Sequence, residues 1–159
     1  MKLILSSILL LFLAPCNKSK QLSNSAEKPD SNSTVNIVYQ TTPCFGRCPT
    51  YTMTINGTSK QMSFVGTANT DKIGTFTKAI SDAELTNLVA EFEKAKFFSL
   101  DNEYLGHIVD FPSKYITYSH NGLNKKIQDR SGGPEAIHIL EKVLEEIANS
   151  EGWIIVNGE

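Results

Sequence analysis

The chain has 159 residues, of which 40% are hydrophobic and 20% charged, the composition of an ordinary globular protein. Its 15 basic and 17 acidic residues give a formal net charge of −2. Because the basic residues are scattered rather than gathered in a stripe, a nucleic-acid partner is not expected.

The N-terminus has the features of an export signal. Met1-Lys2 supplies a short positive start, and residues 3–13 are apolar apart from two serines. This run has the length of a signal-peptide core and is too short to span a bilayer, which needs about 20 residues. Residues 13–16 read Leu-Ala-Pro-Cys and resemble a bacterial lipobox, although the proline departs from that pattern. We therefore expect a lipoprotein signal over residues 1–16 with an acyl anchor on Cys16; ordinary signal cleavage and an uncleaved anchor remain open alternatives.

A polar segment follows the signal. Residues 17–34 are rich in Asn, Ser, Lys and Gln, and bury too little apolar surface to offset their ordering entropy. We expect them to form a flexible tether between the lipid bilayer and a single domain over residues 35–159. This organisation predicts a location in the cell envelope, at a membrane facing the periplasm or the cell surface.

The remaining two cysteines, Cys44 and Cys48, lie in a Pro-bounded segment with Gly46 and Arg47 between them. In an exported protein such a pair favours a disulfide, and Gly46 is expected to turn the chain with a positive φ. Two other interpretations stay open. Arg47 is of the type that lowers a thiolate pKa in a redox pair, and two cysteines supply half of a metal site.

Two hairpins are predicted from alternating apolar residues on either side of Asn-Gly. After a strand over residues 35–39, residues 51–55 alternate strictly up to Asn56-Gly57, and a two-residue turn would pair Ile55 with Thr58. A further strand is expected over residues 73–77. The second hairpin places residues 114–120 against 125–129 around Asn121-Gly122.

Each hairpin is followed by a predicted amphipathic helix. Ser81-Asp82-Ala83-Glu84 is a capping box, and apolar residues recur at helical spacing up to about Lys96. Pro134 suits the first turn of the second helix, which ends near Asn149. We predict an α+β fold, an antiparallel sheet of four to six strands with two helices packed on one face. The recurrence of hairpin and helix indicates either a weak duplication or two examples of a common unit.

A family resemblance rests on residues 44–51, Cys-Phe-Gly-Arg-Cys-Pro-Thr-Tyr. This segment resembles the C-F-G-x-C-P-x-Y signature of an uncharacterised family of bacterial exported domains of unknown function. The order of later features is also similar, including Phe97-Phe98, Asp110-Phe111-Pro112 and the hairpin before Pro134. The resemblance covers roughly Val35 to Trp153. It implies a recurrent exported domain, often on lipoproteins, and implies no activity.

Candidate chemistry is sparse. The sequence has no nucleophile elbow, zinc-protease helix, phosphate loop or dinucleotide fingerprint. We therefore predict no catalytic residue, no metal ligand and no cofactor. A candidate binding loop is assembled from aromatic and polar side chains: Phe45, Arg47, Tyr51, Tyr104, His107, Asp110 and Arg130.

Among the histidines, His107 lies three residues before Asp110 in a proline-bounded loop, a spacing that suits a general acid–base pair or half a metal site. A solvated histidine beside a turn-forming aspartate is the simpler interpretation. His120 abuts the Asn-Gly turn and is expected to be exposed. His138 is expected at the edge of the buried stripe of the second helix.

Three functions remain as hypotheses. The leading one is a non-catalytic, lipid-anchored envelope domain that binds an envelope protein or a small ligand through its open sheet face or its cysteine loop. The second is an envelope thiol–disulfide oxidoreductase that uses Cys44 and Cys48. The third is an enzyme inhibitor, for which Phe45 would be the aromatic anchor.

Overall fold

The structure, a computed structural model, describes residues 34–156. The expected signal, Cys16 and all but the last residue of the expected tether lie outside the described residues. The elements in chain order are β1 (Asn36–Thr41), β2 (Thr50–Asn56), β3 (Gln61–Ala68), β4 (Gly74–Ala79), α1 (Asp82–Lys94), the 3₁₀ turn η2 (Phe97–Ser99), β5 (Glu103–Leu105), β6 (Lys114–His120), β7 (Leu123–Arg130), α2 (Glu135–Asn149) and β8 (Ile154–Ile155).

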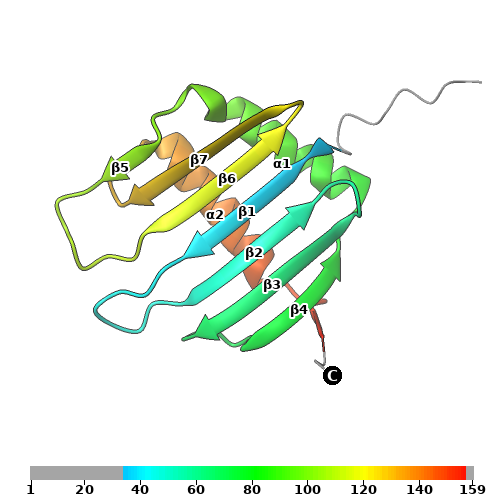
Figure 1. Cartoon of the computed structure of the whole chain (residues 1–159), viewed down its shortest axis with the longest axis horizontal. Coiled ribbons are helices and arrows are strands. Elements are labelled where there is room, and N and C mark those ends of the chain that lie inside the picture. Colours follow the sequence, from blue (N-terminus) through cyan, green and yellow to red (C-terminus); the bar gives the residue numbers. More distant parts are fainter. Residues whose placement is uncertain (1–33, 157–159) are drawn as a thin grey trace, which may run out of the picture.

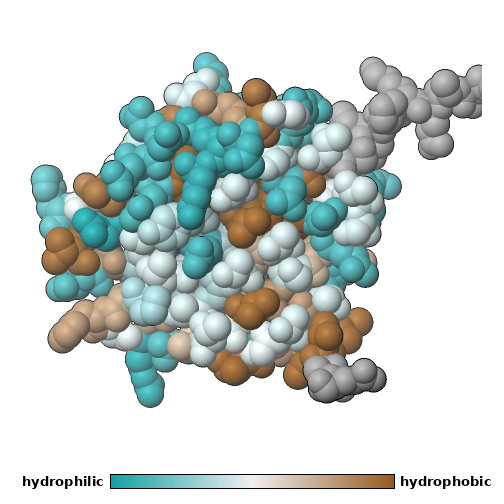
Figure 2. Space-filling model, in the orientation of Figure 1, coloured by the Kyte–Doolittle hydropathy of each residue, from teal (hydrophilic) through white to brown (hydrophobic). Residues whose placement is uncertain are grey.

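The strands form one sheet in the order β5-β7-β6-β1-β2-β3-β4-β8. All neighbouring pairs are antiparallel except β5 and β7, which are parallel. Both helices lie behind the sheet and leave the other face open (Figure 1). That open face is of mixed and mostly intermediate hydropathy (Figure 2), as expected for strands whose outward positions carry mainly Thr, Ser, Asn and Gln.

The predicted α+β class with two helices on one face agrees with this architecture, but the predicted strand count of four to six was too low. The described part of the chain has eight strands. Two of these, β5 with three residues and β8 with two, extend the edges of the sheet. Strands this short show no alternation, so the sequence pattern gave no signal for them.

The first hairpin has a different register from the one predicted. Ile55 pairs with Met62 rather than with Thr58, so four residues, not two, connect β2 to β3. The Asn56 side chain explains the longer turn, because its Oδ1 accepts hydrogen bonds from the backbone N–H groups of Thr58 and Ser59, each at 2.9 Å. The shift keeps every side chain on its predicted face, because it changes the pairing by an even number of residues.

The second hairpin has the predicted register. Ile116 pairs with Ile127 and Tyr118 with Lys125. Asn121 and Gly122 form the two-residue turn with φ of 50° and 79°, the positive values that such a turn requires.

The core lies between the sheet and the helices. Helix α1 begins at the predicted capping box, in which Ser81 and Glu84 exchange hydrogen bonds. The inward face of the sheet meets the apolar stripes of both helices in a continuous buried cluster. Its largest fully buried side chains are Tyr39, Tyr118, Phe64, Phe92, Phe97, Ile37, Met53, Ile55, Leu85, Ile116, Ile127 and Ile137. Neither helix in the described range is long and apolar enough to cross a membrane.

His120 is not exposed as predicted. Its inward position at the end of β6 places the ring against Tyr118, with a centroid distance of 5.7 Å, and leaves the residue 9% exposed. The turn beside it is exposed, but the alternation of β6 directs this side chain towards the core side of the sheet.

Candidate functional site

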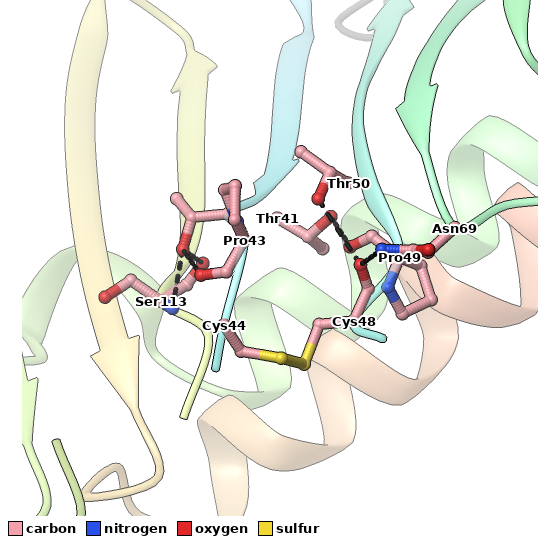
Figure 3. Close-up of a disulfide and its surroundings, with 9 residues drawn as sticks. Thr41, Pro43, Cys44, Cys48, Pro49, Thr50, Asn69 and Ser113 are labelled. Atoms are coloured by element: carbon pink, nitrogen blue, oxygen red, sulfur yellow. Dashed lines mark hydrogen bonds between the residues drawn. A yellow bond between two sulfur atoms is a disulfide. The ribbon is translucent and has the colours of Figure 1, made fainter. Parts of the chain in front are cut away.

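The loops at one end of the sheet bring together the cysteine segment and the β5–β6 connection. The loop from β1 to β2 contains the Cys44–Cys48 disulfide, with the two Cα atoms 5.7 Å apart (Figure 3). At the base of this loop Thr41 Oγ1 donates to the Pro49 carbonyl at 2.8 Å and accepts from the backbone N–H of Tyr51 at 3.1 Å. The disulfide therefore closes the tip of the loop, and the buried Thr41 holds its base.

Neighbouring elements hold the outside of the same loop. Thr42 N–H donates to the Ser113 carbonyl at 3.0 Å. Asn69 Nδ2 donates to the Cys48 carbonyl at 3.2 Å (Figure 3). Gly46 does not adopt the predicted positive φ. A Cβ at this position would make only ordinary contact, at 3.7 Å from Cys44 Sγ. The disulfide loop therefore closes without a left-handed backbone conformation at position 46, so this position does not require glycine.

Apolar side chains are exposed on these loops. Phe45, at the tip of the disulfide ring, is 93% exposed. Its backbone N–H donates to the Asp110 carbonyl at 3.5 Å, which joins the ring to the β5–β6 loop. That loop exposes Ile108, Val109 and Phe111. We call Phe45, Ile108, Val109 and Phe111 the loop-end patch; Figure 2 shows brown and tan side chains projecting at this end of the molecule.

An acidic pocket of about 370 Å³ lies next to the patch. It is lined by Phe111 and Pro112 of the β5–β6 loop, Lys114 of β6, Asp129 of β7, Ser131, and His138, Glu141, Lys142 and Glu145 of α2. Asp129 and Glu141 are almost completely buried. Strand pairing places Lys114 opposite Asp129, and the helical repeat places His138 and Glu141 on one face of α2.

Hydrogen bonds fix the acidic groups of this pocket. Asp129 Oδ1 accepts from the N–H groups of Gly132 and Gly133 at 3.0 and 2.8 Å. Lys114 Nζ bridges Glu141 Oε2 at 3.1 Å and Glu145 Oε1 at 2.8 Å.

Electrostatics in the pocket follow from burial. Burial raises the pKa of Glu141 to about 7, with Lys114 opposing the shift and the Asp129 carboxylate adding to it. Burial alone would lower the pKa of Lys114, but its contacts with Glu145 and Glu141 outweigh that effect and raise it. The Lys114 ammonium group therefore stays protonated, and Glu141 titrates near neutral pH.

A second groove, of about 380 Å³, lies between α1 and α2 and is lined by residues such as Met62, Leu88 and Ile147. It is slightly larger than the acidic pocket. Its lining contains neither Asp129 nor Glu141, the buried carboxylates of the described chain. The acidic pocket is therefore the better candidate for chemistry.

The sequence that forms the disulfide loop and the acidic pocket matches a known protein family. Residues 35–148 match the family model described as "Domain of unknown function (DUF6438)". The chain belongs to this family. The predicted resemblance to a domain family of unknown function is thereby confirmed, and the DUF6438 match spans both the disulfide loop and the acidic pocket. No curated protein matches the chain.

The DUF6438 fold brings some of the predicted binding residues together. Phe45 and Arg47 are exposed on the disulfide ring, while His107 and Asp110 are exposed on the adjoining β5–β6 loop. Tyr51 does not join them, because it is buried in the core and stacked on the Phe64 ring at a centroid distance of 4.8 Å.

Tyr104 and Arg130 form a separate group at the β5–β7 edge. The hydroxyl of Tyr104 accepts a hydrogen bond from the Asp101 N–H at 2.8 Å. Arg130 ends β7 in register with Leu105, and its Nε is buried without a hydrogen-bond partner among the described residues.

Sequence reasoning missed the acidic pocket as a site. The sequence pattern places His138 at the edge of the helical stripe and gives no reason to group Asp129 or Glu141 with it. One signal was present: Glu141 falls in the helical stripe formed by Ile137, Leu140 and Leu144, where an acidic residue must be buried.

Proposed function

We propose that this protein is a non-catalytic interaction domain of the cell envelope, anchored to a membrane by an acyl group on Cys16, and that it binds a protein partner through the loop-end patch. The observation that carries the proposal is the 93% exposure of Phe45 at the tip of a disulfide-closed loop.

Energetics support the patch as a contact surface. Burying a phenylalanine side chain contributes roughly 1.5–3 kcal/mol, and aromatic side chains are frequent anchors of protein interfaces. The Phe45 backbone bonds to Asp110 in the loop that exposes Ile108, Val109 and Phe111, so a partner at this end would cover several apolar groups at once. Because the disulfide and Thr41 already fix the loop, binding would cost little ordering entropy.

The proposed location in the cell envelope rests on the N-terminal sequence and on the disulfide bond. The lipobox-like Leu-Ala-Pro-Cys and the polar segment after it favour an exported, tethered chain. A disulfide persists in oxidising compartments and is rare in the cytosol. An acyl anchor and a tether would present the loops to partners near the membrane surface.

Site-specific photo-crosslinking in the native host tests the proposal. A photoreactive residue would replace Phe45 or Val109 in the full chain, with Val65 on the open sheet face as the matched exposed control. We expect one partner band at positions 45 and 109, absent at position 65 and lost from co-purification with Phe45→Ala. Crosslinking at position 65 alone, or unchanged recovery with Phe45→Ala, would contradict the patch as the binding surface.

The thiol–disulfide alternative has less structural support. Cys48 leads through Pro49 into β2 rather than into a helix N-terminus, which is the feature that stabilises a reactive thiolate. We expect a reduction potential below about −300 mV, as for structural disulfides. A potential near that of known oxidoreductases would instead favour redox activity.

A further inference from the structure

Three metal-ligating side chains converge in the acidic pocket from two elements. Asp129, at the end of β7, faces His138 and Glu141 on α2, and one ligand atom from each lies within 4.8 Å of the others. Asp129 Oδ2 and His138 Nε2 are 3.4 Å apart. Ligands held at 2.0–2.2 Å around a tetrahedral zinc ion are about 3.4 Å from one another, so this pair already has the required spacing.

A second observation is an unsatisfied acceptor. Glu141 is 4% exposed, and its Oε1 is buried without a hydrogen-bond partner among the described residues. Its other oxygen, Oε2, is held by Lys114. A buried carboxylate oxygen without a partner is costly, and a cation in the pocket would satisfy it.

Charge and orientation also suit a divalent cation. Asp129, Glu141, Glu145 and Lys114 carry a formal charge of −2 together when the three carboxylates are ionised, and Lys142 is exposed to solvent. The two glycine N–H groups on Asp129 Oδ1 leave Oδ2 directed at His138. Such outer contacts are typical of metal sites, where they orient the ligating carboxylate.

We propose that Asp129, His138 and Glu141 bind a divalent transition-metal ion, with Zn²⁺ as the best match to one imidazole and two carboxylates. Three protein ligands leave a coordination position open towards the roughly 370 Å³ pocket, where water or a small anion would bind. The three ligands do not belong to the loop-end patch, although Phe111 of the patch also lines the pocket, and the site was not predicted from the sequence. Lys114 does not compete for it, because its ammonium group is already shared by Glu141 Oε2 and Glu145.

The test is calorimetric titration of the metal-stripped full chain with Zn²⁺ alone. We expect one ion per chain with a dissociation constant of about 1 µM or lower. Co²⁺ in place of Zn²⁺ would give visible d–d absorption of a four- or five-coordinate site. Millimolar Mg²⁺ should not compete, because an imidazole ligand disfavours it. Cys44 and Cys48 are joined to each other, so their thiolates do not contribute.

Three variants make the test specific. His138→Gln changes a 43% exposed side chain and should leave folding intact while weakening Zn²⁺ binding more than about 100-fold. His107→Gln, on an exposed loop, is the matched control and should bind as the unaltered chain does. Glu141→Gln should also weaken Zn²⁺ binding. If Glu141 only held a proton and did not contact the metal ion, this substitution would leave the affinity for Zn²⁺ unchanged. Absence of binding at millimolar Zn²⁺, equal competition by Mg²⁺, or unaltered affinity in His138→Gln would overturn the proposal.

Discussion

The hydroxyl of Tyr39 donates a hydrogen bond to Glu145 Oε1 at 2.9 Å, which joins the strand β1 to helix α2 across the core. Tyr39 is fully buried. Burial, reinforced by the charge of Glu145, raises the pKa of Tyr39, so the hydroxyl keeps its proton at all pH values near neutrality. This bond helps to hold the helix that carries His138 and Glu141 against the sheet.

Replacing Tyr39 with Phe should lower the free energy of unfolding by about 1–2 kcal/mol, because a hydrogen bond to a charged acceptor is lost. The loss stays moderate because Lys114 still contacts Glu145. Urea denaturation of the full chain measures it. Tyr115→Phe is the control, since Tyr115 lies on the partly exposed side of β6, and should change stability by less than about 0.5 kcal/mol. Equal effects of the two changes would show that the Tyr39 bond contributes nothing specific.

The same substitution at Tyr118 should not destabilise the fold. Tyr118 is 1% exposed, and its hydroxyl has no hydrogen-bond partner among the described residues. Phenylalanine removes this buried polar atom and keeps the ring contacts with Phe92 and Phe98. We expect Tyr118→Phe to leave stability unchanged or to raise it by about 1 kcal/mol. A loss of stability similar to that of Tyr39→Phe in the same denaturation series would contradict this account.

Alkaline titration gives an independent check on Tyr118. Burial, with a further effect from Glu93, raises its pKa from 10.0 to about 12. The unfolded chain therefore releases this proton first, so native stability falls as pH rises above 10. The stability advantage of Tyr118→Phe over the unaltered chain should be larger at pH 11 than at pH 7. A difference that is constant between these pH values would exclude titration of Tyr118 as the cause.

The hairpins show what local sequence can and cannot specify. Around Asn121-Gly122 the turn residues alone determine the register, because both adopt the positive φ that a two-residue turn needs. The same dipeptide at Asn56-Gly57 does not determine the register. Asn56 Oδ1 accepts hydrogen bonds from two later backbone N–H groups, and these bonds lengthen the turn. The faces of the strands were nevertheless correct, since alternation determines them independently of register.

The acidic pocket could not be assembled from the sequence for a different reason. Asp129 and Glu141 lie on different elements, and only the packing of α2 on the end of β7 brings them together. Local patterns report faces and turns, whereas such a cluster depends on the relative placement of helix and sheet. The one available clue, a glutamate in an apolar helical stripe, indicates a buried charge without naming its partners.

The capping box of α1 should contribute a stability that depends on pH. Hydrogen bonds from Ser81 lower the pKa of Glu84 below its ordinary 4.5. A depressed carboxyl pKa stabilises the fold above that value and the effect disappears as pH falls through the folded-state pKa. Ser81→Ala should cost about 1 kcal/mol at pH 7, and less at pH 3. Thermal unfolding of both chains at the two pH values measures the difference, with Ser59→Ala in an exposed turn as the control. An equal cost at both pH values would remove Glu84 from the explanation.

Removal of the disulfide should act mainly on the loop and less on the fold. A ring with a sequence separation of only four restricts the unfolded chain little, so the double change Cys44→Ser and Cys48→Ser should cost at most about 2 kcal/mol. Thr41 continues to hold the base of the loop through its bonds to Pro49 and Tyr51. Trypsin should therefore cleave faster after the exposed Arg47 of the serine variant, while cleavage elsewhere in the folded domain stays unchanged. If the rate of cleavage rose equally at every tryptic site, the disulfide would be stabilising the whole domain, and the local interpretation would fail.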